Sequence, residues 1–181
     1  MLKRLFVPAL FILWLGVTGA QGQAKDEDYA NVRGSLNVWT TQEVMRNEAK
    51  RGTPPEFLKL RFAQQEGFDR LVFELKGDIA SYHITYSKPP FQSEAGEETI
   101  KVRGQAFVEI SLYSVSSADE NIEANEKVIR QQKLNLLAIN DMKRVEWFEG
   151  ELRYVVGLKK RTAYRVQVLY NPLRVVVDFK H

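Results

Sequence analysis

The chain has 181 residues and no cysteine, with 26 basic and 23 acidic residues and a formal charge of +3. The lack of cysteine excludes disulfides, metal-thiolate centres and a thiol nucleophile, so the core alone must stabilise the fold. Loss of Lys3 and Arg4 with a cleaved leader leaves 24 basic against 23 acidic residues, a formal charge of +1, and so small an excess gives no electrostatic indication of nucleic-acid binding.

Residues 1–20 have the pattern of a secretory signal peptide. The two basic residues precede an apolar run without charge at 5–17, and small residues follow it. The run is shorter than the roughly 20 residues that span a bilayer, so we expect cleavage after Ala20, or as late as Ala24, and no stable membrane anchor afterwards. No lipobox cysteine is present for lipidation. This pattern predicts a periplasmic or secreted protein.

Residues 21–56 form a polar N-terminal segment. Its strand-like stretch is "LNVWT" at 36–40, and the polar connection after it closes on Pro54 and Pro55. Two interpretations remain open: the segment is a tether, or residues 36–39 complete the edge of a sheet.

From residue 57 to the end of the chain, apolar and polar residues alternate in one segment after another. A period of two is typical of strands with one buried face; in the first segment it places Leu58, Leu60 and Phe62 together. The segments are "FLKLRFA" at 57–63, "GFDRLVFELKG" at 67–77, "SYHITYS" at 81–87, "TIKVRG" at 99–104, "QAFVEISL" at 105–112, "AINDMKRVEWF" at 138–148, "ELRYVVGL" at 151–158, "AYRVQVLY" at 163–170 and "LRVVVDF" at 173–179.

Short connections join these predicted strands. Gly67 and Gly77 suit turns, and both "EGE" at 149–151 and the basic "KKRT" at 159–162 are predicted as hairpin connections. Residues 113–135 break the pattern with a charged excursion, predicted as one or two helical turns or an ordered loop. We therefore expect an all-β fold, an antiparallel β-sandwich of about eight strands or, alternatively, a closed up-and-down β-barrel.

Residue types that carry catalysis are sparse. His83 and His181 are isolated, which does not make a metal site, and no serine has the glycine context of a nucleophile elbow. Glu146, Glu149 and Glu151 surround one predicted hairpin, where acidic residues are usually solvated rather than arranged for glycoside hydrolysis. The sequence predicts a protein that is not an enzyme and binds no metal or cofactor.

Two surface features are candidate ligand sites. Lys159, Lys160 and Arg161 lie together in a predicted turn, which they either solubilise or equip to bind an anionic wall polymer or lipid headgroup. Trp147 and Phe148 are consecutive in a predicted strand, so one ring should enter the core and the other reach the surface, where it can stack on a sugar.

Two motifs within the region 57–181 give it a more specific character. Residues 67–70, "GFDR", open one predicted strand, and residues 171–178, "NPLRVVVD", form the last one. With "IKVRGQAFVEISL" at 100–112 and the strands from 145 onward, they resemble the AMIN-like domain family, relatives of the N-terminal domain of bacterial cell-wall amidases. The resemblance implies a β-sandwich in the bacterial envelope, with a role in peptidoglycan association or in placing envelope machinery. It implies no catalysis and assigns no ligand residue.

The leading hypothesis is a non-catalytic exported envelope module whose partner is peptidoglycan or an envelope protein. Two other classes remain open. One is a periplasmic β-barrel carrier of a small apolar ligand. The other is an envelope hydrolase of unfamiliar type, built on His83 or on the acidic residues around 146–151.

Overall fold

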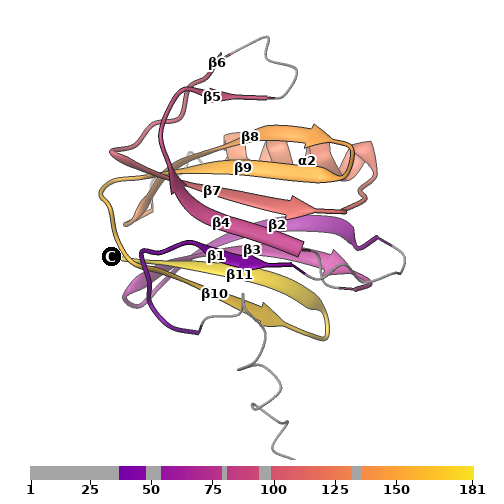
Figure 1. Ribbon diagram of the computed structural model, residues 1–181, viewed down its shortest axis with the longest axis horizontal. Helices are drawn as coiled ribbons and strands as arrows, with labels where there is room; N and C mark the ends of the chain where they lie inside the picture. Colours follow the sequence, from indigo (N-terminus) through magenta and orange to yellow (C-terminus); the bar gives the residue numbers. More distant parts are fainter. Residues whose placement is uncertain (1–36, 48–53, 79–80, 94–98, 132–135) are drawn as a thin grey trace, which may run out of the picture.

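The computed structural model describes residues 37–47, 54–78, 81–93, 99–131 and 136–181, which form two facing β-sheets (Figure 1). The five-stranded sheet contains, in spatial order, β1 (Val44–Arg46), β4 (Ser81–Ser87), β7 (Ala106–Tyr113), β9 (Glu151–Leu158) and β8 (Ile139–Phe148). The four-stranded sheet contains β10 (Tyr164–Leu169), β11 (Leu173–Lys180), β3 (Phe68–Lys76) and β2 (Glu56–Gln65). Two short strands, β5 (Phe91–Gln92) and β6 (Thr99–Ile100), form a separate ribbon.

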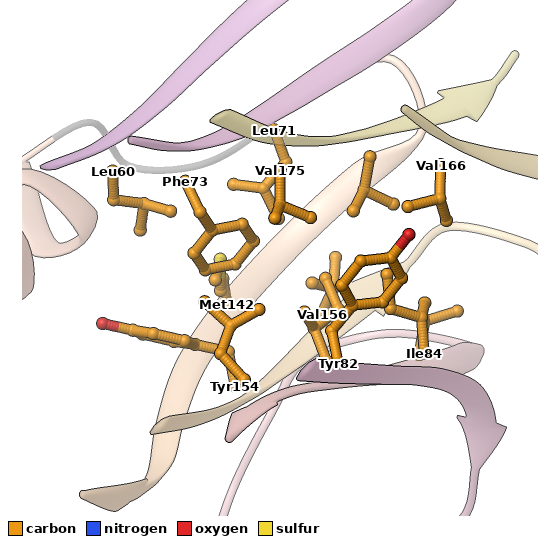
Figure 2. Close-up of a cluster of buried hydrophobic side chains, with 14 of the residues drawn as sticks. Leu60, Leu71, Phe73, Tyr82, Ile84, Met142, Tyr154, Val156, Val166 and Val175 are labelled. Atoms are coloured by element: carbon orange, nitrogen blue, oxygen red, sulfur yellow. The ribbon is translucent and has the colours of Figure 1, made fainter. Parts of the chain in front are cut away.

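The two sheets enclose one core, as the alternation of apolar residues predicts. Figure 2 shows Leu71, Phe73 and Val175 of the four-stranded sheet facing Tyr82 and Tyr154 of the five-stranded sheet, and all five side chains are fully buried. The prediction of an antiparallel sandwich is confirmed. The alternative of a closed barrel is wrong, because neither sheet closes on itself within the described part of the chain, and the carrier hypothesis loses its structural basis.

The strand β2 departs from its predicted phase. Its register against β3 shifts between Phe57 and Lys59, which marks a β-bulge. Phe57 and Leu60 are therefore buried while Leu58 is only half-buried. The prediction that Leu58 shares the core face with Leu60 and Phe62 is wrong, because an extra residue in one strand reverses the alternation.

The two predicted hairpins have different outcomes. The connection at 149–151 is a hairpin between β8 and β9, with Glu149 and Gly150 at positive φ. The connection at 159–162 is not a hairpin: β9 pairs with β7 and β8, whereas the next strand, β10, pairs with β11 in the other sheet. The basic segment therefore links the two sheets at one end of the sandwich.

The excursion at 113–135 contains a helix longer than the predicted one or two turns. Helix α2 (Asp119–Gln131, 13 residues) lies against β2 and β8, and Ile122, Asn125 and Ile129 form its buried stripe. The Asn125 amide oxygen accepts the N–H of Leu60 at 2.8 Å, and its nitrogen donates to the carbonyl of Leu58 at 3.3 Å. The helix thus covers the edge of β2, which would otherwise present unpaired backbone groups.

The two motifs of the family resemblance lie side by side on β3 and β11. Asp178 stands opposite Arg70, which donates to its two carboxylate oxygens at 2.7 and 2.9 Å. Asp69 points the other way and accepts the N–H groups of Ala138 and Ile139, at 2.6 and 2.9 Å, where β8 of the facing sheet begins. Both acidic residues therefore determine the fold, one within a sheet and one between sheets.

Part of the N-terminal region joins the fold. Thr40 exchanges two backbone hydrogen bonds of 2.8 Å with Tyr164 at the start of β10, and β1 pairs with β4. Of the residues 36–39, the last three are described and form no strand. The signal peptide predicted at 1–20 lies outside the described residues, and no helix within them is long and apolar enough to cross a membrane.

Candidate functional site

Arg161 lies over the ring of Tyr86, where the link between the sheets passes the end of β4. Its guanidinium carbon is 3.8 Å from the ring centroid, a cation-π arrangement, and its Nη2 donates to the carbonyl of Thr41 at 3.4 Å. The Tyr86 hydroxyl donates to the carbonyl of Thr162 and accepts the N–H of that residue at 3.0 Å. The ring and the connection therefore hold the guanidinium in one position.

Two clefts of about 450 Å³ each flank this stacked pair. Tyr86, Ser87, Lys88 and Arg161 line both of them. One cleft is completed by Thr41, Gln42, Glu43 and Thr85, and the other by Pro89, Gln105, Ala106 and Phe107. A volume of this size suits a small-molecule fragment or a short stretch of polymer.

The clefts are cationic with one apolar side. Lys88 and Arg161 face both of them, Lys159 and Lys160 are exposed on the adjoining link, and Glu43 is the acidic residue of the first cleft. Burial raises the pKa of Tyr86 above its ordinary value, so its phenol stays protonated at neutral pH. The arrangement suits a ligand that carries a carboxylate beside a small apolar group.

The aromatic pair lies elsewhere, but its two rings point as predicted. Trp147 packs against the core opposite Leu152, whereas Phe148 is 57% exposed opposite Glu151. The whole of β9, roughly 25 Å at the usual rise per residue, separates this hairpin from the basic link. The structure therefore does not bring the two sets of candidate residues together.

Two of the three acidic residues around the β8–β9 hairpin lie beside a basic one. Arg153 lies 3.6 Å from both Glu146 and Glu151 and 4.0 Å from Glu109. His83 lies in β4 with its Nε2 3.3 Å from a carboxylate oxygen of Glu43. Neither arrangement leaves a free acid pair or an activated nucleophile, and the described residues contain no group of three side chains placed to hold a metal ion.

Sequence reasoning missed Tyr86 and Lys88 as site residues. The period of two assigned Tyr86 to the core face with Tyr82 and Ile84, and its ring does pack against the core. Only the outer face of the ring and the hydroxyl of Tyr86 contribute to the clefts. The signal for Lys88 was its place between the end of a strand and two prolines, where a side chain is commonly exposed.

The AMIN-like domain model matches residues 55–181, which run from just before β2 to the residue after β11. The chain belongs to the AMIN-like domain family. Comparisons with curated proteins and with solved structures found no match. AMIN-like domains are in general non-catalytic modules of the cell envelope. The match includes β4 and the basic link, while the residues of the first cleft at 41–43 lie ahead of it.

Proposed function

We propose that this AMIN-like protein is an exported, non-catalytic envelope module that binds peptidoglycan, or an envelope protein, through the two clefts around Arg161. Family membership supports the envelope role. The observation that carries the site is the position of Arg161, held on Tyr86 between two clefts that also expose Lys88.

The chemistry of peptidoglycan matches these clefts. Its stem peptides carry carboxylates and small apolar side chains on a polar glycan. A guanidinium fixed on one face keeps N–H donors at its edge, the geometry that binds a carboxylate with two hydrogen bonds. Lys88 adds a second cation, Pro89 and Phe107 supply an apolar side, and Lys159 and Lys160 attract the polyanion from outside the clefts.

Phe148 offers a second, separate contact. Its ring is exposed at the tip of the β8–β9 hairpin and can stack on a sugar ring. Trp147 contributes indirectly, because its packing against the core fixes the strand from which Phe148 projects. We assign residues 1–20 to the signal peptide that takes the module across the membrane.

Co-sedimentation with purified sacculi tests this function. The chain without residues 1–20 should pellet with sacculi at low salt and be released as salt shortens the Debye length to about 8 Å. The double variant Lys88→Gln/Arg161→Gln should bind about tenfold more weakly, the value of one charge-assisted hydrogen bond. Phe148→Ala should show a smaller loss.

The matched control is Lys127→Gln/Lys143→Gln, which removes the same charge from α2 and β8, away from both clefts. It should pellet like the unchanged chain. If the unchanged chain stays in the supernatant at low salt, the module does not bind peptidoglycan. Equal losses of sacculus binding in the two double variants would show that the binding site is not in the clefts.

A further inference from the structure

The outward surface of the four-stranded sheet is basic. Side chains that alternate with the core residues of β2, β3, β10 and β11 point away from the facing sheet. Among these described residues, seven are basic and three acidic (Glu56, Glu74 and Asp178), which leaves a formal charge of +4. We name this surface the basic face. Its basic residues are Lys59 and Arg61 on β2, Arg70 and Lys76 on β3, Arg165 on β10, and Arg174 and Lys180 on β11.

The outward strand residues of the five-stranded sheet have the reverse charge. They include four acidic side chains, Glu109, Asp141, Glu146 and Glu151, against two basic ones, Lys143 and Arg153, a formal charge of −2 within the described part of that sheet. The β5–β6 ribbon also lies on this side of the molecule (Figure 1), where Phe91 packs with Val145 and Val155. Among the strand residues of the two sheets, the positive excess therefore lies on the basic face, which can orient that face toward a negative partner.

Two arginines at one end of the basic face are held in place. Asp178 is fully buried and accepts hydrogen bonds from Arg70 and from Arg165, whose Nε lies 2.8 Å from one carboxylate oxygen. The Arg165 guanidinium also lies 4.6 Å from the Trp39 ring and 4.9 Å from the Phe68 ring. Both arginine side chains stay partly exposed, at 28% and 21%. Their remaining N–H groups are pre-oriented donors, the kind that bind phosphate with two hydrogen bonds.

We propose that the basic face docks reversibly on an anionic lipid bilayer, with headgroup phosphates as its ligands. Cations on all four strands form a two-dimensional array roughly 15 Å wide across the strands, which fits a plane of headgroups better than a single polymer strand. Neither of the two clefts includes a residue of this face. Trp39 lies beside Arg165, and indole rings favour the membrane–water interface. This surface is separate from the cleft residues and adds a second partner to the proposed function.

Vesicle sedimentation tests the proposal. The chain without residues 1–20 is used, so that its apolar segment does not itself enter lipid. It should bind vesicles of equal parts phosphatidylglycerol and phosphatidylcholine at low salt, and it should not bind vesicles of pure phosphatidylcholine. The variant Lys59→Gln/Arg61→Gln/Lys180→Gln should bind about 100-fold more weakly, because each basic residue near an anionic surface contributes about a fivefold factor.

The control variant, Lys101→Gln/Lys127→Gln/Lys143→Gln, removes the same charge from exposed positions outside the basic face and should lose less than about threefold. All six residues are exposed or half-exposed, and unchanged thermal unfolding of both variants verifies their folds. Equal binding of the two variants, or of the two kinds of vesicle, overturns the proposal. If the unchanged chain does not bind anionic vesicles, and the basic-face variant loses sacculus binding while the control variant keeps it, the partner of this face is the wall polymer and the lipid assignment is wrong. Sacculus binding by the cleft variants is measured separately, so either proposal can fail alone.

Discussion

Asp178 is fully buried on the outward side of its strand, although the side chains of Arg70 and Arg165 on the two adjacent strands are partly exposed. Its carboxylate is covered by Arg70 and Arg165, and the side-chain amide of Gln167 lies 3.3 Å from one of its oxygens. The hydrogen bond that Arg70 donates to Asp178 raises the pKa of Arg70 despite its partial burial, so the guanidinium stays charged at neutral pH. One acidic residue thus compensates two cations that would otherwise repel each other across β11.

Replacing Asp178 with alanine should therefore destabilise the fold strongly. The change leaves two half-buried guanidiniums without their anion, and breaking such a buried pair costs about 3 kcal/mol. The free energy of unfolding from urea titration measures this loss. Lys180→Gln, two residues along the same strand and exposed, is the control, with an expected change within about 0.5 kcal/mol. Similar losses in the two variants would contradict a structural role for the Asp178 cluster.

At the level of the elements, the alternation of apolar and polar residues predicted the features that depend only on residues near each other in the sequence. The alternation in "LRVVVDF" and "GFDRLVFELKG" gave β11 and β3, because one side of each strand faces the core. Pairing is a long-range property: nothing near residues 159–162 indicates that β10 joins the other sheet. The bulge at Phe57 likewise depends on its partner strand. The clefts were unpredictable for the same reason, since Tyr86 and Arg161 are distant in sequence and meet only in the folded chain.

The strand β11 should be indispensable for folding. It lies between β10 and β3, with residues paired on both sides, and Leu173, Val175, Val177 and Phe179 are buried. Burial of four such side chains contributes on the order of 8 kcal/mol, comparable with the whole stability of a domain. Deletion of residues 173–181 should abolish the cooperative thermal transition seen by circular dichroism, whereas deletion of His181 alone should preserve it. A truncated chain with an unchanged melting temperature would refute this expectation.

At the scale of the whole molecule, tyrosines in the core join the two sheets. The Tyr154 ring of β9 lies 5.8 Å from the Phe73 ring of β3, and the Tyr164 hydroxyl of β10 bonds the carbonyl of Ile84 in β4 at 2.9 Å. Burial raises the pKa of Tyr154 and of Tyr164 well above the ordinary value of 10.0. With no cysteine in the chain, stability at high pH depends on this core remaining uncharged.

The sandwich should therefore lose stability at alkaline pH. Tyrosines in the unfolded chain release their protons near pH 10, whereas the buried tyrosines of the folded chain keep theirs. The stability that the buried phenols contribute is therefore complete below about pH 10, and it declines as the pH rises toward the pKa of the folded state. The Tyr154 hydroxyl has no hydrogen-bond partner among the described residues, so Tyr154→Phe should cost little at neutral pH. In urea unfolding between about pH 9 and about pH 11, the free energy of unfolding of this variant should fall less steeply than that of the unchanged chain. The difference in slope should be up to about 1.4 kcal/mol per pH unit.

Tyr164→Phe separates ionisation from hydrogen bonding in the same core. The substitution removes the hydrogen bonds to the carbonyls of Ile84 and Gln42, so it should lower the free energy of unfolding by about 1 kcal/mol already at neutral pH. At high pH the stability of this variant should also fall less steeply than that of the unchanged chain. Tyr113→Phe, at an exposed position, is the control for loss of a phenol. If the unchanged chain and Tyr154→Phe lose stability in parallel through the alkaline range, the buried phenols do not set the limit, and another titrating group must open the sandwich.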